Sequence, residues 1–216
     1  MVELKLEKVF NFQNDKDPYF NLFNKVCNAH LFFILNIFYK YFVTFKWEGN
    51  AMKPIKIGIA GLGNVGEEVA YQLIKGFRVQ KNLFQIELVA VSARSKNKKR
   101  KVDINHLKFF DNPIDMVSDN SINVIVELIG GDEGIAKDLC FSALKNNKAV
   151  ITANKALIAK YGKELAEIAE EKNLFFSFEA SVAGGIPILK LIREGLIVND
   201  ITKVTGILNG TANYIL

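Results

Sequence analysis

Three glycines at fixed spacing constrain this chain more than any other feature of its sequence. Gly61, Gly63 and Gly66 directly follow a short apolar run, Ile55–Ala60, and they precede a segment with apolar residues at helical spacing, residues 67–75. A continuous apolar run of this length is typical of a strand buried on both faces of a parallel sheet. Strand, glycine turn and helix start, in this order, form the context in which the glycine pattern binds a dinucleotide.

Each glycine has a separate role in that pattern. Gly61 permits the tight turn, Gly63 lets the backbone approach the pyrophosphate, and Gly66 lets the helix pack close to the strand. The first helical residues, among them Asn64 and Val65, then present free N–H groups to the phosphates. We therefore expect an α/β Rossmann fold, with a doubly wound, mostly parallel sheet that binds NAD(P). The alternative is a glycine turn that serves packing alone.

The end of the second predicted strand, residues 86–91, indicates which cofactor is bound. In sites that prefer NAD, an acidic residue at this end binds the ribose hydroxyls. Here the strand runs instead into Ser92 and Arg94, and then into the basic run 98–101. A guanidinium group pairs with phosphate through two parallel hydrogen bonds. We therefore expect Arg94, with Ser92, to bind the 2′-phosphate of NADP, with NAD as the alternative cofactor. The run 98–101 is interpreted as a solvated surface loop.

A third predicted strand, residues 123–128, ends in a glycine pair. Ile129, Gly130 and Gly131 follow it, and a helix is expected around residues 134–146. Glycines at the carboxyl end of a strand allow a flat ring to approach closely. The nicotinamide is therefore expected at this loop.

A further strand, Ala149–Thr152, leads into Asn154 and Lys155. Ligands of open α/β sheets bind outside the carboxyl ends of the strands. Both side chains are therefore expected at the cofactor crevice. His106 lies beyond the basic run and is interpreted as a local polar contact rather than a proton donor.

Residues 1–51 differ in composition from the rest of the chain. They are rich in Phe, Asn, Lys and Tyr, and residues 29–45 are strongly apolar. A membrane helix needs about 20 apolar residues, whereas this run is shorter and contains Asn36 and Lys40. It also lacks the flanking pattern of a signal peptide. We favour an extension foreign to the fold over an amphipathic appendage or a membrane anchor.

Charge and cysteine content exclude other classes. The 28 basic and 23 acidic side chains leave a net charge of +5, which does not by itself indicate a nucleic-acid partner. Cys27 and Cys140 lie far apart and form no disulfide framework. We interpret both as free thiols in a reducing cytoplasm, and we expect a small-molecule substrate and no membrane.

Four stretches together resemble the homoserine dehydrogenase family. They are residues 58–66, which many dehydrogenases share, and the more distinctive residues 151–159, 179–189 and 206–216. The resemblance begins at Met52. It implies NAD(P)H-dependent reduction of L-aspartate 4-semialdehyde to L-homoserine, in the biosynthesis of threonine, methionine and isoleucine. It also implies three parts: the extension 1–51, a cofactor domain at 52–180, and a hinge with the beginning of an α+β substrate and dimerisation domain at 181–216.

The same resemblance implies roles for individual residues. Lys155 matches the family lysine that contacts the nicotinamide end and the substrate, and it is the catalytic candidate. A monovalent cation, sodium or potassium, is implied at the segment that joins the two domains: Glu179, Val182, Gly184 and Ile186. A hinge turn that ends at Pro187 is the alternative explanation for the glycines of that segment.

Asn209, Gly210 and Thr211 are the substrate-binding candidates, and the alternative is that they only cap and turn the chain. The family places a catalytic Asp and Lys on a helix downstream of this turn, beyond Leu216. The resemblance therefore predicts an incomplete chain with weak activity or none, and a homodimer for the full-length protein. Two alternatives remain: a cofactor-binding module without catalysis, and a related amino-acid dehydrogenase.

Overall fold

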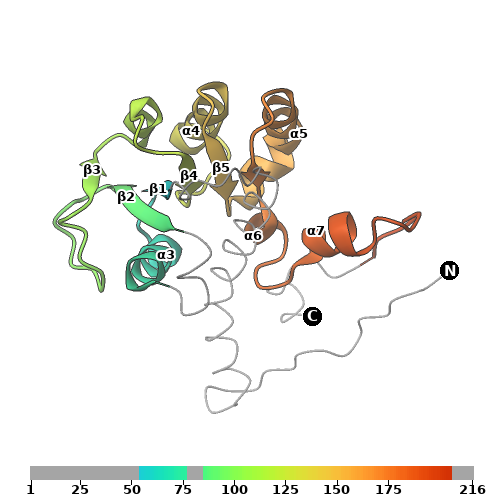
Figure 1. Cartoon of the computed structure of the whole chain (residues 1–216), viewed down its shortest axis with the longest axis horizontal. Coiled ribbons are helices and arrows are strands. Elements are labelled where there is room, and N and C mark those ends of the chain that lie inside the picture. Colours follow the sequence, from blue (N-terminus) through green and yellow to red (C-terminus); the bar gives the residue numbers. More distant parts are fainter. Residues whose placement is uncertain (1–53, 77–84, 206–216) are drawn as a thin grey trace, which may run out of the picture.

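The fold is a parallel sheet covered by helices on both faces (Figure 1). The computed structural model describes residues 54–76 and 85–205. Its strands are β1 Ile55–Ala60, β2 Ile86–Ser92, β3 Lys108–Phe110, β4 Val124–Glu127, β5 Ala149–Thr152 and β6 Phe176–Ser177. Its helices are α3 Asn64–Lys75, η1 Pro113–Ser118, α4 Ile135–Lys145, α5 Lys155–Glu171, α6 Glu179–Val182, α7 Ile188–Lys190 and the π-helical turn η2 Leu191–Gly195.

The order of the strands in space is β3-β2-β1-β4-β5-β6, and every described pair is parallel. From β1 the chain builds outward through β2 to β3, then returns to β4 on the other side of β1 and continues to β6. The winding therefore reverses between β1 and β4. This is the strand order of the dinucleotide-binding α/β fold, so the predicted fold class is confirmed.

Two apolar cores lie on opposite faces of the sheet because successive side chains of a strand point to opposite faces. One core joins alternate strand residues, such as Ile57 and Val126, to the apolar side of α3. The other joins the remaining residues, such as Ile125 and Val150, to η1, α4 and α5. Figure 1 shows α3 on one side of the sheet and α4 and α5 on the opposite side. Cys140 of α4 is a buried free thiol, as expected.

The sequence predicted the central elements and missed the outer ones. β1 and β5 have the expected bounds, β2 extends one residue further than predicted, and β4 is one residue shorter at each end. The short edge strands β3 and β6, and η1, were not predicted. The boundary between residues 180 and 181 remains a prediction. Residues 1–51 and 209–211 lie outside the described part of the chain.

Beyond β6, the described chain continues through α6 to α7 and η2, with α7 set apart from the sheet (Figure 1). Within residues 54–76 and 85–205, no helix combines the length and apolarity needed to cross a membrane.

Candidate cofactor site

The carboxyl ends of four neighbouring strands meet in one row across the sheet. Ser92 of β2 is paired with Ala60 of β1, Ala60 with Glu127 of β4, and Glu127 with Thr152 of β5. The loops that leave these four residues carry most of the predicted cofactor-binding side chains. The row also spans the point where the winding reverses, which is where open α/β sheets bind their ligands.

The glycine turn leaves β1 and is closely packed at two of its three glycines. Gly61 has a φ of 99°, and a Cβ there would lie 2.6 Å from the carbonyl oxygen of Leu128. A Cβ on Gly66 would lie 1.8 Å from the carbonyl oxygen of Gly61. Around Gly63, in contrast, a Cβ would meet no described atom within 4 Å. The fold therefore requires Gly61 and Gly66, whereas Gly63 leaves open space at the start of α3.

The N-terminus of α3 faces this open space. Gly63 is its N-cap residue, and its carbonyl accepts the N–H of Glu67 at 2.8 Å. Asn64 and Val65 are exposed in the first turn. The free N–H groups of such a turn, together with the helix dipole, suit an anion.

Arg94 is placed beside the glycine turn by the end of β2. The carbonyl of Ser92, a buried residue, accepts the N–H of Gly61 at 2.9 Å. Arg94 follows two residues later and is exposed. Its guanidinium forms no hydrogen bond or ion pair with another residue of the described chain. This group is therefore available to an anionic ligand.

The loop after Arg94 is more ordered than a solvated run, and this corrects part of the expectation for residues 98–101. The Arg100 guanidinium donates to the carbonyls of Ser95, Lys96 and Lys98 at 2.6, 3.0 and 3.1 Å. Such bonds close the loop on itself, while Lys98 and Lys99 stay exposed as predicted.

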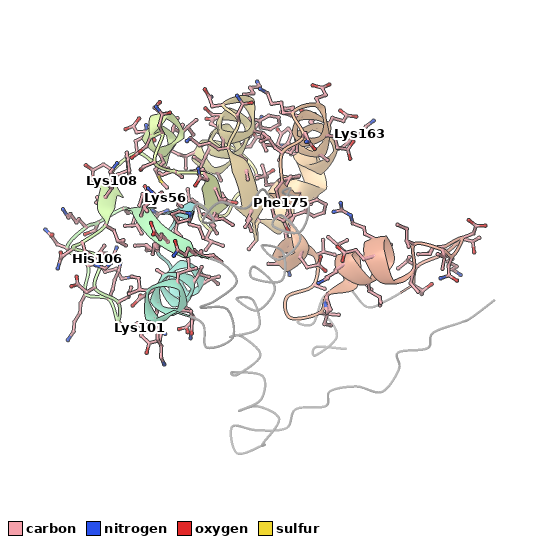
Figure 2. The ribbon with its side chains drawn as sticks, viewed as in Figure 1. Lys56, Lys101, His106, Lys108, Lys163 and Phe175 are labelled. Carbon is pink, nitrogen blue, oxygen red and sulfur yellow. The ribbon has the colours of Figure 1, made fainter. Side chains whose placement is uncertain are left out.

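Lys101 then joins the loop to α3 (Figure 2). Its ammonium pairs with Glu68, and its backbone N–H donates to Glu67. The hydrogen bond to Glu68 raises the pKa of Lys101 and lowers that of Glu68. His106 is exposed just before the edge strand β3, remote from β5 in the strand order (Figure 2).

The glycine pair after β4 forms an open loop with a buried carboxylate beneath it. Gly130 and Gly131 both have a φ of 86°, a region that favours glycine, and no described atom lies within 4 Å of a Cβ at either. The Oε1 of Glu127 accepts the N–H groups of Ile129 and Gly130 at 2.7 and 3.0 Å. Its Oε2 accepts the hydroxyl of Thr152 at 2.5 Å.

Glu127 and Thr152 were not singled out from the sequence. Glu127 lies inside an apolar strand pattern, and its partner Thr152 is 25 residues away. The available signal was an acidic residue in a run otherwise typical of a buried strand. Buried carboxylates require hydrogen-bond partners. The N–H groups of the glycine loop that follows Glu127 could have been predicted as those partners.

Asn154 connects the two loops that follow β4 and β5. Its Oδ1 accepts the N–H of Leu157 at 3.2 Å, which makes it the N-cap residue of α5. Its Nδ2 donates to the carbonyl of Gly131, and its own N–H donates to the Thr152 hydroxyl at 3.0 Å.

Lys155 is the first residue of α5 and is exposed. Among the described residues its ammonium has no hydrogen-bond or ion-pair partner. The structure thus brings Asn154 and Lys155 to the same edge of the sheet as the glycine loops.

The proposed cation segment follows β6. Glu179 opens α6 and is buried, and its carboxylate accepts the N–H groups of Leu189 and Lys190 at 2.8 and 3.2 Å. No cationic side chain of the described chain pairs with it. A carboxylate oxygen is a ligand that a hard cation prefers, and both oxygens of Glu179 are bonded here to backbone N–H groups. The carbonyl of Ile186 already accepts the N–H of Ile188 at 2.8 Å.

Comparison with known proteins gives a consistent result for the chain from residue 61 onward. Residues 61–179 match the family described as "Homoserine dehydrogenase, NAD binding domain", and residues 187–216 match "Homoserine dehydrogenase". The chain is 42% identical over 167 residues to the homoserine dehydrogenase of Neisseria gonorrhoeae. It is 43% identical over 176 residues to that of Pseudomonas aeruginosa. Each match covers 76% of this chain but 38% of the relative, so the chain spans well under half of their length.

Two solved structures show the same relationship in space. A homoserine dehydrogenase from Thiobacillus denitrificans superimposes with a TM-score of 0.59 at 40% identity, over 69% of this chain and 35% of that one. A hyperthermophilic archaeal homoserine dehydrogenase in complex with NADPH gives a TM-score of 0.55 at 26% identity, over 68% of this chain and 50% of that one.

Proposed function

The chain belongs to the homoserine dehydrogenase family, and we propose that it forms the cofactor half of an NAD(P)H-dependent reductase of L-aspartate 4-semialdehyde. The product is L-homoserine, in the biosynthesis of threonine, methionine and isoleucine. One observation carries the proposal: the open Gly63 at the start of α3 lies at the reversal of the winding, between the ends of β2 and β4.

NADP is the proposed cofactor, with NAD as the alternative. The pyrophosphate binds at Gly63 and at the N–H groups of Asn64 and Val65, where the helix dipole favours negative charge. The exposed guanidinium of Arg94 pairs with the 2′-phosphate, beside Ser92. The open loop of Ile129, Gly130 and Gly131, with Asn154 and Lys155 at the start of α5, would hold the nicotinamide end. The archaeal neighbour in complex with NADPH supports this choice of cofactor.

The chemistry requires stabilisation of negative charge at the substrate. A bound NADPH would supply a hydride for the aldehyde carbon, so the site must stabilise the negative charge that develops on the carbonyl oxygen and provide a proton to it. Lys155 is an exposed cation at the crevice. We assign it to contact the nicotinamide end and to support this charge, while the resemblance places the principal proton donor downstream of residue 216.

Other proposed features rest on the resemblance. The monovalent cation, sodium or potassium, would be held by Glu179 and by the backbone of Val182, Gly184 and Ile186, and the buried charge of Glu179 supports this assignment. Asn209, Gly210 and Thr211 are the proposed substrate contacts. We further propose a homodimer for the whole protein, a small-molecule substrate as its partner, and a cytoplasmic location.

Cofactor binding can be tested on the 216-residue chain by titration with NADPH and NADH, with nucleotide fluorescence as the signal. We expect saturable binding of NADPH that adenosine 2′,5′-bisphosphate, the adenine-side fragment, displaces. NADH should bind more weakly, since it lacks the 2′-phosphate. A chain that is folded by circular dichroism yet binds neither nucleotide would contradict the proposed function.

A further inference from the structure

Glu127, Thr152 and Asn154 form a buried hydrogen-bonded network between the glycine loop after β4 and the start of α5. We propose that Glu127 is a positioning residue for the nicotinamide end of the cofactor, and that its buried charge favours the oxidised, cationic ring over the reduced, neutral one. This inference rests on the proposed function and assigns to Glu127 a role in that same site.

The first step is how Glu127 shapes the glycine loop. Its Oε1 accepts two successive N–H groups, of Ile129 at 2.7 Å and Gly130 at 3.0 Å. These bonds turn the chain sharply at the end of β4 and hold the backbone at the start of the loop. Glu127 is fully buried, and strand pairing fixes it on both sides. The carboxylate of Glu127 therefore holds the backbone at the start of this loop.

The second step is the connection to Lys155. The Thr152 hydroxyl donates to Oε2 of Glu127 at 2.5 Å and accepts the N–H of Asn154 at 3.0 Å. The side chain of Asn154 donates to the carbonyl of Gly131 and also caps α5, whose first residue is Lys155. One network thus fixes both the loop proposed to receive the ring and the helix start that presents the lysine.

The third step concerns charge. Three hydrogen-bond donors point at the Glu127 carboxylate. This arrangement suits an ionised carboxylate, because both of its oxygens accept hydrogen bonds and neither donates one. No cationic side chain of the described chain pairs with it. Burial is the main cause of the raised pKa of the Cys140 thiol, and the charge of Glu127 is the second cause. Burying an unpaired charge is costly. A neutral oxygen acceptor could also hold the loop, so the hydrogen bonds alone do not explain a charged residue at this position. An oxidised nicotinamide on the loop would provide the missing positive charge.

The experiment uses Glu127→Gln, which keeps the size of the side chain and its Oε1 acceptor but removes the charge. NADPH, NADP⁺ and adenosine 2′,5′-bisphosphate are titrated by calorimetry into the parent and the variant. We expect unchanged affinity for the adenine-side fragment and weaker binding of both dinucleotides. NADP⁺ should lose roughly fivefold or more affinity relative to NADPH, because only the oxidised ring carries the positive charge that the carboxylate attracts.

Thr152→Val separates position from charge, because it breaks the network and leaves the carboxylate in place. It should weaken NADPH and NADP⁺ by the same factor, and Thr152→Ser, which restores a hydroxyl, should recover most of the affinity. Glu133→Gln is the matched control, since this carboxylate lies near the same loop but is exposed and paired with Lys137 and Lys160. It should leave the ratio of the NADP⁺ and NADPH affinities unchanged.

Three outcomes would overturn the inference. The first is parent-like binding of both dinucleotides by Glu127→Gln. The second is an equal loss of affinity for NADP⁺ and NADPH in that variant. The third is a loss of affinity for adenosine 2′,5′-bisphosphate, which would show that the network supports the whole sheet edge and not the nicotinamide end alone. Failure of the parent to bind any dinucleotide is a different result, because it would contradict the proposed function itself.

Discussion

The glycines of the turn after β1 serve different purposes, and alanine substitution should separate them. Gly66→Ala places a methyl group 1.8 Å from the Gly61 carbonyl, so the backbone must shift. We expect a loss of about 1–3 kcal/mol or more in the free energy of unfolding, the usual cost of overpacking. Urea unfolding followed by circular dichroism measures it.

Gly63→Ala is the matched variant, because its methyl group would meet no described atom within 4 Å. It should unfold at the same urea concentration as the parent and bind NADPH roughly tenfold or more weakly, the equivalent of one hydrogen bond to a charged group. Equal stability losses in the two variants would contradict the separation of roles.

Arg94 is the residue on which the choice of cofactor depends. Arg94→Asp removes the proposed partner of the 2′-phosphate and introduces an acceptor for ribose hydroxyls. Since a hydrogen bond to a charged group contributes about 1.5–3 kcal/mol, NADPH affinity should fall roughly tenfold or more relative to NADH. Lys99→Asp makes the same charge change on an exposed residue of the same loop. If both variants lowered NADPH affinity equally, Arg94 would contribute only to the overall positive charge of the loop and not through direct contact with the 2′-phosphate.

Sequence patterns revealed the residues whose chemistry is local. The glycine turn, Arg94 and the start of α5 each follow a recognisable strand, and the structure places them at one sheet edge. Glu127, Thr152 and Arg100 were missed for a common reason. Their functions depend on partners that the sequence does not show, such as the 25-residue separation between Glu127 and Thr152 or the carbonyl groups that Arg100 gathers from its own loop.

At the scale of elements, apolar runs in the sequence predicted the buried strands. The short edge strands β3 and β6 were not predicted. β3 has three residues and β6 has two, and such lengths leave no periodic pattern. A tertiary contact holds the β3 edge, and Lys148 ties the start of β5 to the segment before β4. Lys108 of β3 bonds Asp119 at 2.8 Å, and Lys148, ahead of β5, donates to the carbonyls of Asp119 and Ile122 at 2.8 and 2.7 Å.

Asp119 should therefore make the stability of this edge depend on pH. Its hydrogen bonds with Lys108 and Ser121 lower its pKa from 3.8 to about 2. A lowered pKa in the folded state stabilises the fold above the ordinary value, and this contribution disappears as the pH falls through about 2. We expect Asp119→Asn, which can still accept the N–H of Ser121, to lower the free energy of unfolding at pH 7 and much less at pH 2.

Urea unfolding at several pH values between 2 and 7 tests this expectation. Glu167→Gln is the control, because Glu167 lies 3.8 Å from Lys163 in a surface pair with both side chains largely exposed. Its loss should be small at every pH. A constant difference between parent and Asp119→Asn across the range would show that the charge of Asp119 contributes nothing.

At the scale of the whole molecule, the described chain divides into a packed sheet with its helices and an apolar continuation. The large apolar side chains with the highest exposed fractions lie beyond α6, and they include Ile186, Ile197, Val198 and Val204. The matched part of the chain covers 38% of the length of the Neisseria gonorrhoeae and Pseudomonas aeruginosa relatives. Such surfaces are typical of contacts between protein parts. The residues proposed for the cofactor lie at the carboxyl edge of the sheet, whereas those proposed for the substrate lie outside the described part of the chain.

Turnover should therefore require more of the family's catalytic domain than these 216 residues contain. We expect the 216-residue chain to bind NADPH and to reduce aspartate semialdehyde orders of magnitude more slowly than a chimaera extended with the catalytic domain of the Neisseria gonorrhoeae relative, because groups that act as a unit cannot be removed without large losses. NADPH oxidation followed by absorbance compares the two, and Lys155→Ala in the chimaera tests the assigned contribution of that lysine. Equal turnover by both chains would make Lys155 the principal acid. Absence of turnover in a chimaera that binds NADPH would favour a binding module without catalysis.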